Sequence, residues 1–245
     1  MKKIYYITAV FATLFLVGCG DGIDLPGVNV ETDLNKIPLP DNNVNLEQVE
    51  LKPSTEPMLH EGLHTEEDFQ RIRDKKAAGE EPWVSAYQLL VESQFSQKTA
   101  DTYPTEWIKR GISGDENYMN AARGATIVYQ QALRWKIEQD DEYAAKAVEN
   151  LNKWVQTCVG VTGNTNLSLA AGLYGYEFAI AGELLRDYGG WDRADFAAFQ
   201  NWLLKVFYPA NDDFLKRHHD TNALHYWANW CLCNIAAKMA IGHLT

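Results

Sequence analysis

The sequence lacks an excess of positive charge. Its 245 residues include 22 Lys and Arg against 33 Asp and Glu, which gives a formal net charge of −11. Proteins that bind a phosphate backbone carry a basic patch or stripe, and none is present here. We therefore expect no nucleic-acid partner. An anionic ligand would need a local site with positive or hydrogen-bonding groups, because the overall charge repels it.

Cysteines are also few, and segments in which apolar and polar residues alternate are missing. The four cysteines are Cys19, Cys158, Cys231 and Cys233, and their spacing is not that of a zinc site, so we expect no metal and no cofactor. Residues two apart on a helix point in different directions, so Cys231 and Cys233 cannot pair with each other. Cys158 could pair with either one, although buried free thiols are favoured. No segment alternates with period two over a useful length, which argues against an extended sheet.

A long membrane-spanning run is missing as well. Lys2 and Lys3 precede an apolar run over residues 4–17, which is too short for a comfortable span and predicts an export signal over residues 1–18. The letters "LVGC" resemble a bacterial lipobox, which implies lipidation of Cys19. The alternative is an ordinary secretory signal with an incidental cysteine. We expect an exported, periplasmic or outer-membrane lipoprotein whose lipid anchor lies in the membrane.

The rest of the chain divides into two parts. Residues 19–57 are rich in Pro, Asn and Asp without helical periodicity, which predicts a flexible tether. Residues 58–245 form the expected domain. Because an apolar segment leads directly to the last residue, we expect this domain to be the N-terminal part of a longer one.

Helical patterns dominate this domain and predict an all-α fold. Thr65 and Asp192 stand where helices begin, and the acidic pair Asp140 and Asp141 predicts the turn of a helical hairpin. Helices with one charged face, at 141–156 and 193–206, alternate with helices that are apolar nearly all round, at 166–188 and 222–244, and that we therefore expect to be buried on several sides. Concentric rings of helices would produce this order. After Pro209 the sequence predicts a polar turn before the last helix.

Polar residues interrupt the last apolar helix. Asn222, His225 and Asn229 are spaced to share one helix face. Burying them without partners would cost roughly 1–3 kcal/mol for each group, so they line a polar cavity or join a hydrogen-bond network. Spacing alone favours a structural histidine.

A second group of polar residues lies where the helix at 166–188 begins. Asn166 is expected to cap this helix, yet an amide at a helix N-terminus is also well placed to hold a carboxylate. Asn164 lies in the preceding turn. Tyr174 lies farther along the helix, where core packing is the default interpretation.

His218 and His219 precede the last helix. Only Asp220 is adjacent as a further ligand, so a metal site is not favoured. Lys216 and Arg217 could form a cationic rim for an acidic ligand.

Four segments together resemble a known family. They are "LHTEEDFQRIRDKKAAGEEPWVSAYQLL", "ALRWKIEQDDEYAAKAVENLNKW", "TGNTNLSLAAGLYGYEFAIAGELLRDY" and "HHDTNALHYWANWCLCNIAAKMAIG". They are similar to the alginate lyase family of polysaccharide lyases, and in particular to its exported Bacteroidetes-type members. The resemblance implies an α/α toroid that cleaves an acidic, uronic-acid-containing polysaccharide by β-elimination.

The resemblance also implies roles for individual residues. Asn166 or Asn164 would neutralise the uronate carboxylate, and His225 would remove the C5 proton. A Tyr acid and a supporting Arg would lie C-terminal to Thr245. The expected catalytic residues are His225 and Asn166, and the expected substrate-binding residues are Asn164, Asn222, Asn229, His218, His219, Tyr174 and Trp227.

Two other functions remain open from the sequence. An inverting glycosidase on a helical toroid would need two facing carboxylic acids, for which Asp212, Asp213 and Glu177 are the candidates. A surface lipoprotein that binds glycans without cleaving them, or an inactive fragment of a lyase, is the non-enzymatic alternative.

Overall fold

The described part of the chain consists of packed helices and one very small sheet. A computed structural model describes residues 62–220 and 228–245. The predominance of helix confirms the all-α class. The expected signal and tether, together with Asn222, His225 and Trp227, lie outside the described residues.

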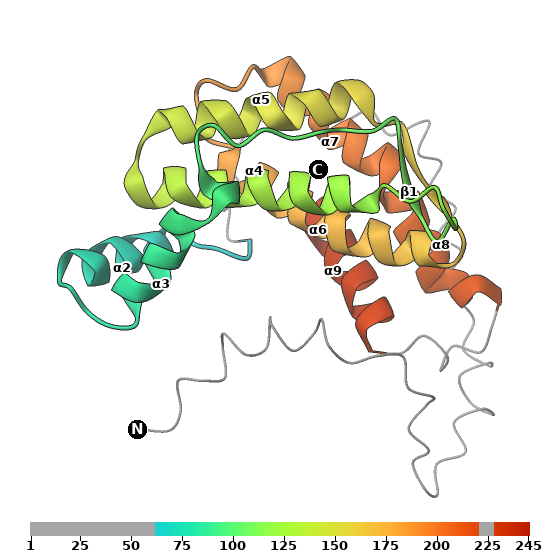
Figure 1. The fold of residues 1–245 in the computed structure, drawn as a ribbon, viewed down its shortest axis with the longest axis horizontal. Coiled ribbons are helices and arrows are strands. Elements are labelled where there is room, and N and C mark those ends of the chain that lie inside the picture. Colours follow the sequence, from blue (N-terminus) through green and yellow to red (C-terminus); the bar gives the residue numbers. More distant parts are fainter. Residues whose placement is uncertain (1–61, 221–227) are drawn as a thin grey trace, which may run out of the picture.

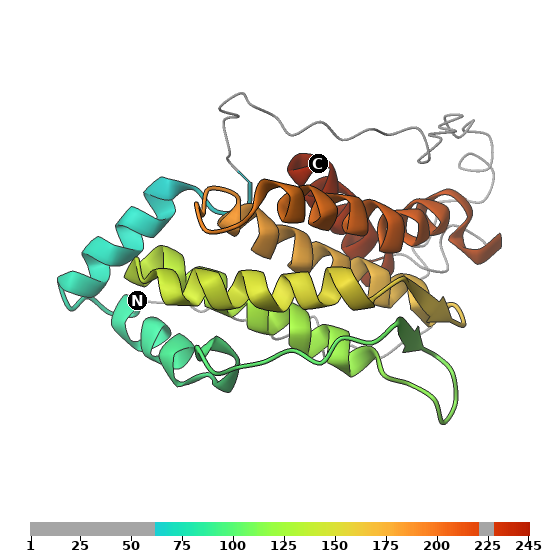
Figure 2. The same cartoon turned by 90° about the horizontal axis from the view of Figure 1, so that it is seen from above.

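The helices run largely alongside one another. Figures 1 and 2 show α4 to α7 side by side, with α2 and α3 at one end of the molecule and β1 at the other. The elements in chain order are α2 (Glu66–Ala77), α3 (Trp83–Glu92), the 3-10 helix η4 (Gln94–Ser96), β1 (Trp107–Arg110), α4 (Tyr118–Glu138), α5 (Asp141–Thr157), β2 (Gly160–Gly163), α6 (Asn166–Leu185), α7 (Arg193–Val206), α8 (Tyr208–Arg217), the 3-10 helix η5 (His218–Asp220) and α9 (Asn229–Leu244).

Side-chain caps start several of these helices where the sequence predicts them. The Thr65 hydroxyl accepts a hydrogen bond from the Asp68 amide at 3.1 Å, and the Asp68 carboxylate accepts one from the Thr65 amide at 3.1 Å. This capping box satisfies two amides that the first turn of α2 leaves without partners. Asp140 caps α5 and Asp192 caps α7, so the predicted hairpin of α4 and α5 is confirmed.

An aromatic cluster forms the centre of the core. The Phe178 ring on α6 lies 5.4 Å from the Trp154 ring, 5.2 Å from the Trp202 ring and 6.0 Å from the Phe207 ring, measured between centroids. These four side chains come from α5, α6, α7 and the residue after α7. Such aromatic side chains bury large apolar areas, so α6 is the element around which the others pack.

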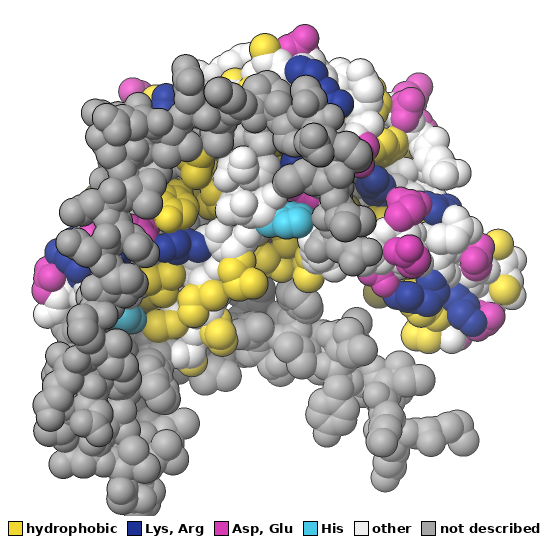
Figure 3. Space-filling view, turned by 180° about the vertical axis from the view of Figure 1, so that it is seen from behind, with side chains coloured by type: hydrophobic (Ala, Val, Ile, Leu, Met, Phe, Trp, Pro, Cys, Tyr) yellow, Lys and Arg dark blue, Asp and Glu magenta, His cyan; other side chains and the backbone are white. Residues whose placement is uncertain are grey.

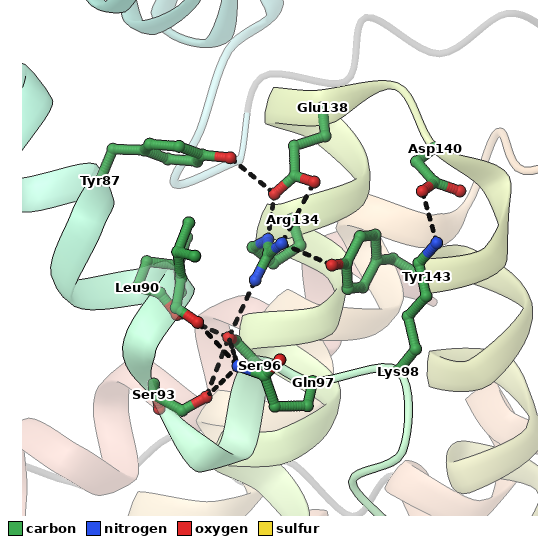
Figure 4. A network of polar contacts seen from close by, with 11 residues as sticks. Tyr87, Leu90, Ser93, Ser96, Gln97, Lys98, Arg134, Glu138, Asp140 and Tyr143 are labelled. Atoms are coloured by element: carbon green, nitrogen blue, oxygen red, sulfur yellow. Dashed lines mark hydrogen bonds and ion pairs between the residues drawn. The ribbon is translucent and has the colours of Figure 1, made fainter.

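A buried ion pair joins the helices at the α2 and α3 end. The guanidinium of Arg134 pairs with Glu138 one turn on, donates to the Ser96 hydroxyl at 3.3 Å, and also contacts the Tyr143 hydroxyl (Figure 4). The Tyr87 hydroxyl donates to Glu138 at 2.8 Å. The network therefore links α3, η4, α4 and α5. Because its charges have partners, we regard it as structural.

The small sheet is absent from the sequence-based prediction. β1 and β2 pair in parallel, from Trp107 opposite Gly160 to Arg110 opposite Gly163. Strands of four residues are too short to show a period-two pattern. The pairing fixes the segment before α4 beside the start of α6.

The region after α7 differs from the prediction. A helix, α8, occupies the segment expected as a polar turn, and Pro209 lies in its first turn. Proline is tolerated there because the first amides of a helix have no internal partner. α9 begins at Asn229 rather than at Asn222, because Ala228 has φ 64° and ψ −119°, which a helix cannot contain. The helix expected over residues 222–244 is therefore interrupted at Ala228.

The last helix is also less buried than expected. α9 packs on α6, α7 and α8 within the described residues, but Leu232, Ile235 and Met239 remain exposed. Hydrophobic side chains gather at the surface seen from behind in Figure 3. The prediction of burial on several sides is therefore wrong for the described surroundings of α9. The toroid stays a prediction.

Two further findings concern cysteines and the membrane. Cys158, Cys231 and Cys233 form no disulfide with one another, as favoured from the sequence, and Cys158 is buried. In residues 62–220 and 228–245, no helix has both the length and the apolarity that crossing a membrane requires.

Candidate functional site

The parallel strands bring two glycines and Asn164 into close contact. A Cβ atom on Gly111 would lie 1.8 Å from the Asn164 Oδ1, and a Cβ on Gly163 would lie 1.7 Å from the Arg110 carbonyl oxygen. Both glycines have positive φ, at 81° and 147°. Only glycine fits such positions without displacing its neighbours. The sequence therefore fixes Asn164 against the end of β1.

Asn164 caps the buried helix. Its Oδ1 accepts hydrogen bonds from the backbone amide of Asn166 at 2.9 Å and from the Asn166 Nδ2 at 3.0 Å. Thr165, the residue before α6, makes no side-chain cap. The expected capping role thus belongs to Asn164. The Asn166 amide retains its oxygen and a second hydrogen beyond this bond, at the positive end of a 20-residue helix.

His219 contacts the first turn of α6, and His218 contacts the first turn of α9. The Ser168 hydroxyl and the His219 Nε2 lie 3.3 Å apart, and the Cys231 Sγ and the His218 Nε2 lie 3.4 Å apart. His218, His219 and Asp220 have φ of 45°, 56° and 59°. A left-handed conformation costs a non-glycine residue on the order of 1 kcal/mol or more. The chain is thus held in a strained turn that carries His219 to the first turns of α6.

Tyr174 lies on the same face of α6 as Asn166, about two turns farther along. Its side chain is buried, and burial raises the pKa of the phenol to about 12, against the opposing effect of the nearby Arg110 charge. The Arg110 guanidinium lies 4.6 Å from the Tyr118 ring centroid. Its Nη1 is buried and has no hydrogen-bond partner. Arg110 and Tyr118 therefore adjoin the predicted residue Tyr174.

A carboxylate with a raised pKa, that of Glu177, lies farther along α6. Burial raises the pKa of Glu177 to about 7, although a hydrogen bond with Thr126 opposes the shift. Tyr129 is close enough for its pKa to be raised further by the Glu177 charge, and its hydroxyl lies 2.7 Å from the His64 Nε2. An acidic residue between Tyr176 and Phe178 in a mostly apolar helix is a signal that the sequence offers. With a pKa of about 7, this carboxyl changes its charge near neutral pH in the folded chain.

The structure thus brings together part of the predicted set. Asn164, Asn166 and Tyr174 lie along the amino half of α6, and His219 reaches it through Ser168. Asn229 is exposed at the start of α9. His225, Asn222 and Trp227 are outside the described residues, so their roles stay predictions.

Sequence reasoning missed Arg110 and Tyr118. Arg110 stands in "WIKRG", beside another basic residue and before a polar loop, which reads as an ordinary surface segment. Only the pairing of β1 with β2 brings it to α6. No local signal could have identified it.

Two of the three carboxylates considered for a glycosidase, Asp212 and Asp213, form ion pairs with basic residues. Burial opposes ionisation of Asp212, but Lys238 at 2.7 Å and Lys216 at 3.0 Å outweigh it and lower the pKa of this carboxyl. Asp213 pairs with Arg217 at 2.7 Å. A general acid needs a raised pKa, so the Asp pair is unsuited to that role.

Other kinds of site find no support in the described residues. No group of three or more His, Cys, Asp or Glu among residues 62–220 and 228–245 is arranged to hold a metal ion. A surface hollow beside α2 is lined by Glu67, Gln70, Arg71 and neighbouring polar residues. This hollow includes none of the predicted site residues.

Comparison with known proteins identifies the family of this chain. The sequence model of the family described as alginate lyase matches residues 72–243. This match covers most of the chain and defines its class as that of the polysaccharide lyases, which act on polysaccharides. The chain belongs to the alginate lyase family. No curated protein and no solved structure matches it.

Proposed function

We propose that this protein cleaves a uronic-acid-containing polysaccharide, such as an alginate-like or glucuronan-like polymer, by β-elimination. The observation that carries the proposal is the placement of Asn164 and Asn166 at the amino end of α6, in a chain of the alginate lyase family. Amide donors and the positive end of a helix favour a carboxylate. Arg110 and Tyr174 on the same side of α6 add positive charge and a hydroxyl.

In the proposed reaction, the Asn166 amide binds the uronate carboxylate and stabilises the negative charge that develops when the C5 proton leaves. His225 takes this proton as general base. The electron pair of the broken C5–H bond forms the C4–C5 double bond, and the C4–O bond breaks. The departing glycosidic oxygen takes a proton from a general acid. The product has an unsaturated sugar at its new non-reducing end.

The test is an elimination assay on polymannuronate, polyguluronate and glucuronan, read by the ultraviolet absorbance of the unsaturated product. His225→Ala and Asn166→Ala should each lower turnover, by roughly 10²–10⁴-fold for the base. His243→Gln is the matched control, since His243 lies at the far end of α9 and pairs with Glu183 at 3.3 Å.

Three outcomes would contradict the proposal. New saturated reducing ends without ultraviolet absorbance would indicate hydrolysis. Binding of the polymers without turnover would indicate a glycan-binding protein. Full activity of His225→Ala would remove that residue from the role of base.

We also propose that the protein is exported and anchored through a lipid on Cys19. The support is the basic and apolar sequence before it and the lipobox-like letters around it. Expressed in a Gram-negative host, the wild type should fractionate with membranes, and Cys19→Ser should not. Cys231→Ser, which alters a thiol within the described domain, should leave fractionation unchanged. If all three proteins divide equally between the membrane and soluble fractions, the proposed lipid anchor on Cys19 is refuted.

A further inference from the structure

Arg110 differs from the other buried or half-buried arginines of the described residues. Arg73, Arg134 and Arg186 each form an ion pair with a carboxylate. No Asp or Glu among residues 62–220 and 228–245 forms an ion pair with Arg110, and its Nη1 is buried without a hydrogen-bond partner. A buried polar atom without a partner is uncommon in native proteins and calls for an explanation. Within residues 62–220 and 228–245, Arg110 is the arginine that combines a buried, unpartnered N–H group with the absence of an ion pair.

Among the residues that the structure describes, the groups around Arg110 do not neutralise its charge. The Tyr118 ring interacts with the face of the guanidinium, but the N–H donors point along its plane and need acceptors. Tyr174 and Cys233 both lie within electrostatic reach. Burial raises the pKa of each to about 12, so both are neutral in the physiological range. The positive charge is therefore left available to an anion.

The backbone places this charge beside the amides of the candidate site. Arg110 ends β1 opposite Gly163, and Gly111 touches the Asn164 side chain. Arg110 also adjoins Tyr174, which is on the same face of α6 as Asn166. A carboxylate bound along this face could meet both the amides and the guanidinium.

We propose that Arg110 binds the carboxylate of a uronate unit and makes the site selective for charged over neutral sugar units, an inference that rests on the proposed function. The planar guanidinium matches a carboxylate with two parallel hydrogen bonds, which a lysine ammonium cannot reproduce. Arg110 would thus determine specificity from a segment outside the predicted set of residues.

The experiment compares two substrates that differ only in charge: a uronate oligosaccharide as the free acid and the same oligosaccharide as its methyl ester. For Arg110→Gln, kcat/KM on the free acid should fall about 100-fold, as for loss of one preorganised donor, and change less than about 3-fold on the ester. Arg110→Lys should fall between wild type and Arg110→Gln. Arg123→Gln, at an exposed arginine on α4, is the matched control and should alter neither value.

The ratio of the two kcat/KM values separates specificity from stability. Equal losses on both substrates, or no loss on either, would overturn the proposal. If Arg110→Gln does not give the wild-type circular dichroism spectrum, the ratio for Arg110→Lys decides in the same way. If wild type yields no unsaturated product, the proposed function fails. Calorimetry with the saturated free acid then tests Arg110 alone, and unchanged affinity of Arg110→Gln would overturn the inference.

Discussion

α6 and α9 have the same apolar character in the sequence but very different surroundings in the fold. α6 buries 13 of its 20 residues, whereas α9 buries 4 of its 16. The two helices pack against each other, so each supplies one covered side to the other. α6 is also covered by α4, α7 and α8, while α9 packs mainly on α6, α7 and α8 in the described part of the chain. An apolar sequence thus indicates that all sides of a helix are suited to burial. The neighbouring elements determine which sides are buried in the fold.

Small residues explain how α6 accommodates so many neighbours. A Cβ on Gly172 would lie 2.6 Å from the Cys233 Sγ on α9, and one on Gly182 would lie 2.2 Å from the Phe199 ring on α7. Gly242 on α9 has nothing within 4 Å of the same position. Glycine therefore permits close helix approach on α6 and has no such role at the end of α9.

The largest expected effect comes from emptying the centre of α6. Phe178→Ala should lower the free energy of unfolding by about 3–5 kcal/mol, because the ring is fully buried among Trp154, Trp202 and Phe207. Met239→Ala on α9 is the matched truncation, and at 70% exposure it should change stability by less than about 0.5 kcal/mol. Urea denaturation measures both. Similar losses in the two variants would mean that α9 is as well covered as α6.

The next effect concerns the buried carboxylate of α6. Burial raises the Glu177 pKa from 4.5 to about 7, so the folded chain holds a proton that the unfolded chain releases at lower pH. The associated stability is present below pH 4.5 and is lost as pH rises to about 7, by up to about 3 kcal/mol. Glu177→Gln, which stays neutral, should match wild type near about pH 4 and exceed it near about pH 8.

Denaturation at the two pH values measures this difference. Glu92→Gln, at an exposed residue of α3, is the control and should leave stability nearly unchanged at both. If Glu177→Gln differs from wild type by the same amount at both pH values, the Glu177 pKa is the same in the folded and unfolded chain and the burial argument fails.

A third test acts on the contact between the two helices. Gly172→Val should destabilise the fold by about 1–3 kcal/mol, because the added atoms meet the Cys233 Sγ and the backbone of Asn234. Gly242→Ala should instead stabilise it by about 0.5–1 kcal/mol, since the space is open and alanine favours a helix. Thermal melts distinguish the two signs. A stabilising Gly172→Val would show that α6 and α9 can separate at little cost.

Much of this fold could be predicted because local rules set it. Thr65, Asp140 and Asp192 cap helices through their own side chains, and such caps depend on a few neighbouring residues. The four-residue strands and α8 were missed, since short strands lack a readable period and a proline can start a helix as well as end one.

The candidate site likewise contains residues that the sequence could predict and one that it could not. Asn164 and Asn166 could be found because both lie where an apolar helix begins, which the sequence shows directly. Arg110 could not, since its place beside Tyr174 depends on strand pairing between segments about 50 residues apart. His225, the predicted base, lies outside the described residues and is tested by the elimination assay alone.

The smallest expected effect on stability comes from the exposed face of α9. Leu232 and Ile235 are 60% and 42% exposed, so replacing each with Gln should change the free energy of unfolding by no more than about 0.5 kcal/mol. Contiguous apolar surface nevertheless promotes association between molecules. Leu232→Gln/Ile235→Gln should therefore remain soluble to a higher concentration than wild type while melting at nearly the same temperature. A large fall in melting temperature would show that these side chains are covered in solution, and the contrast between α6 and α9 would then disappear.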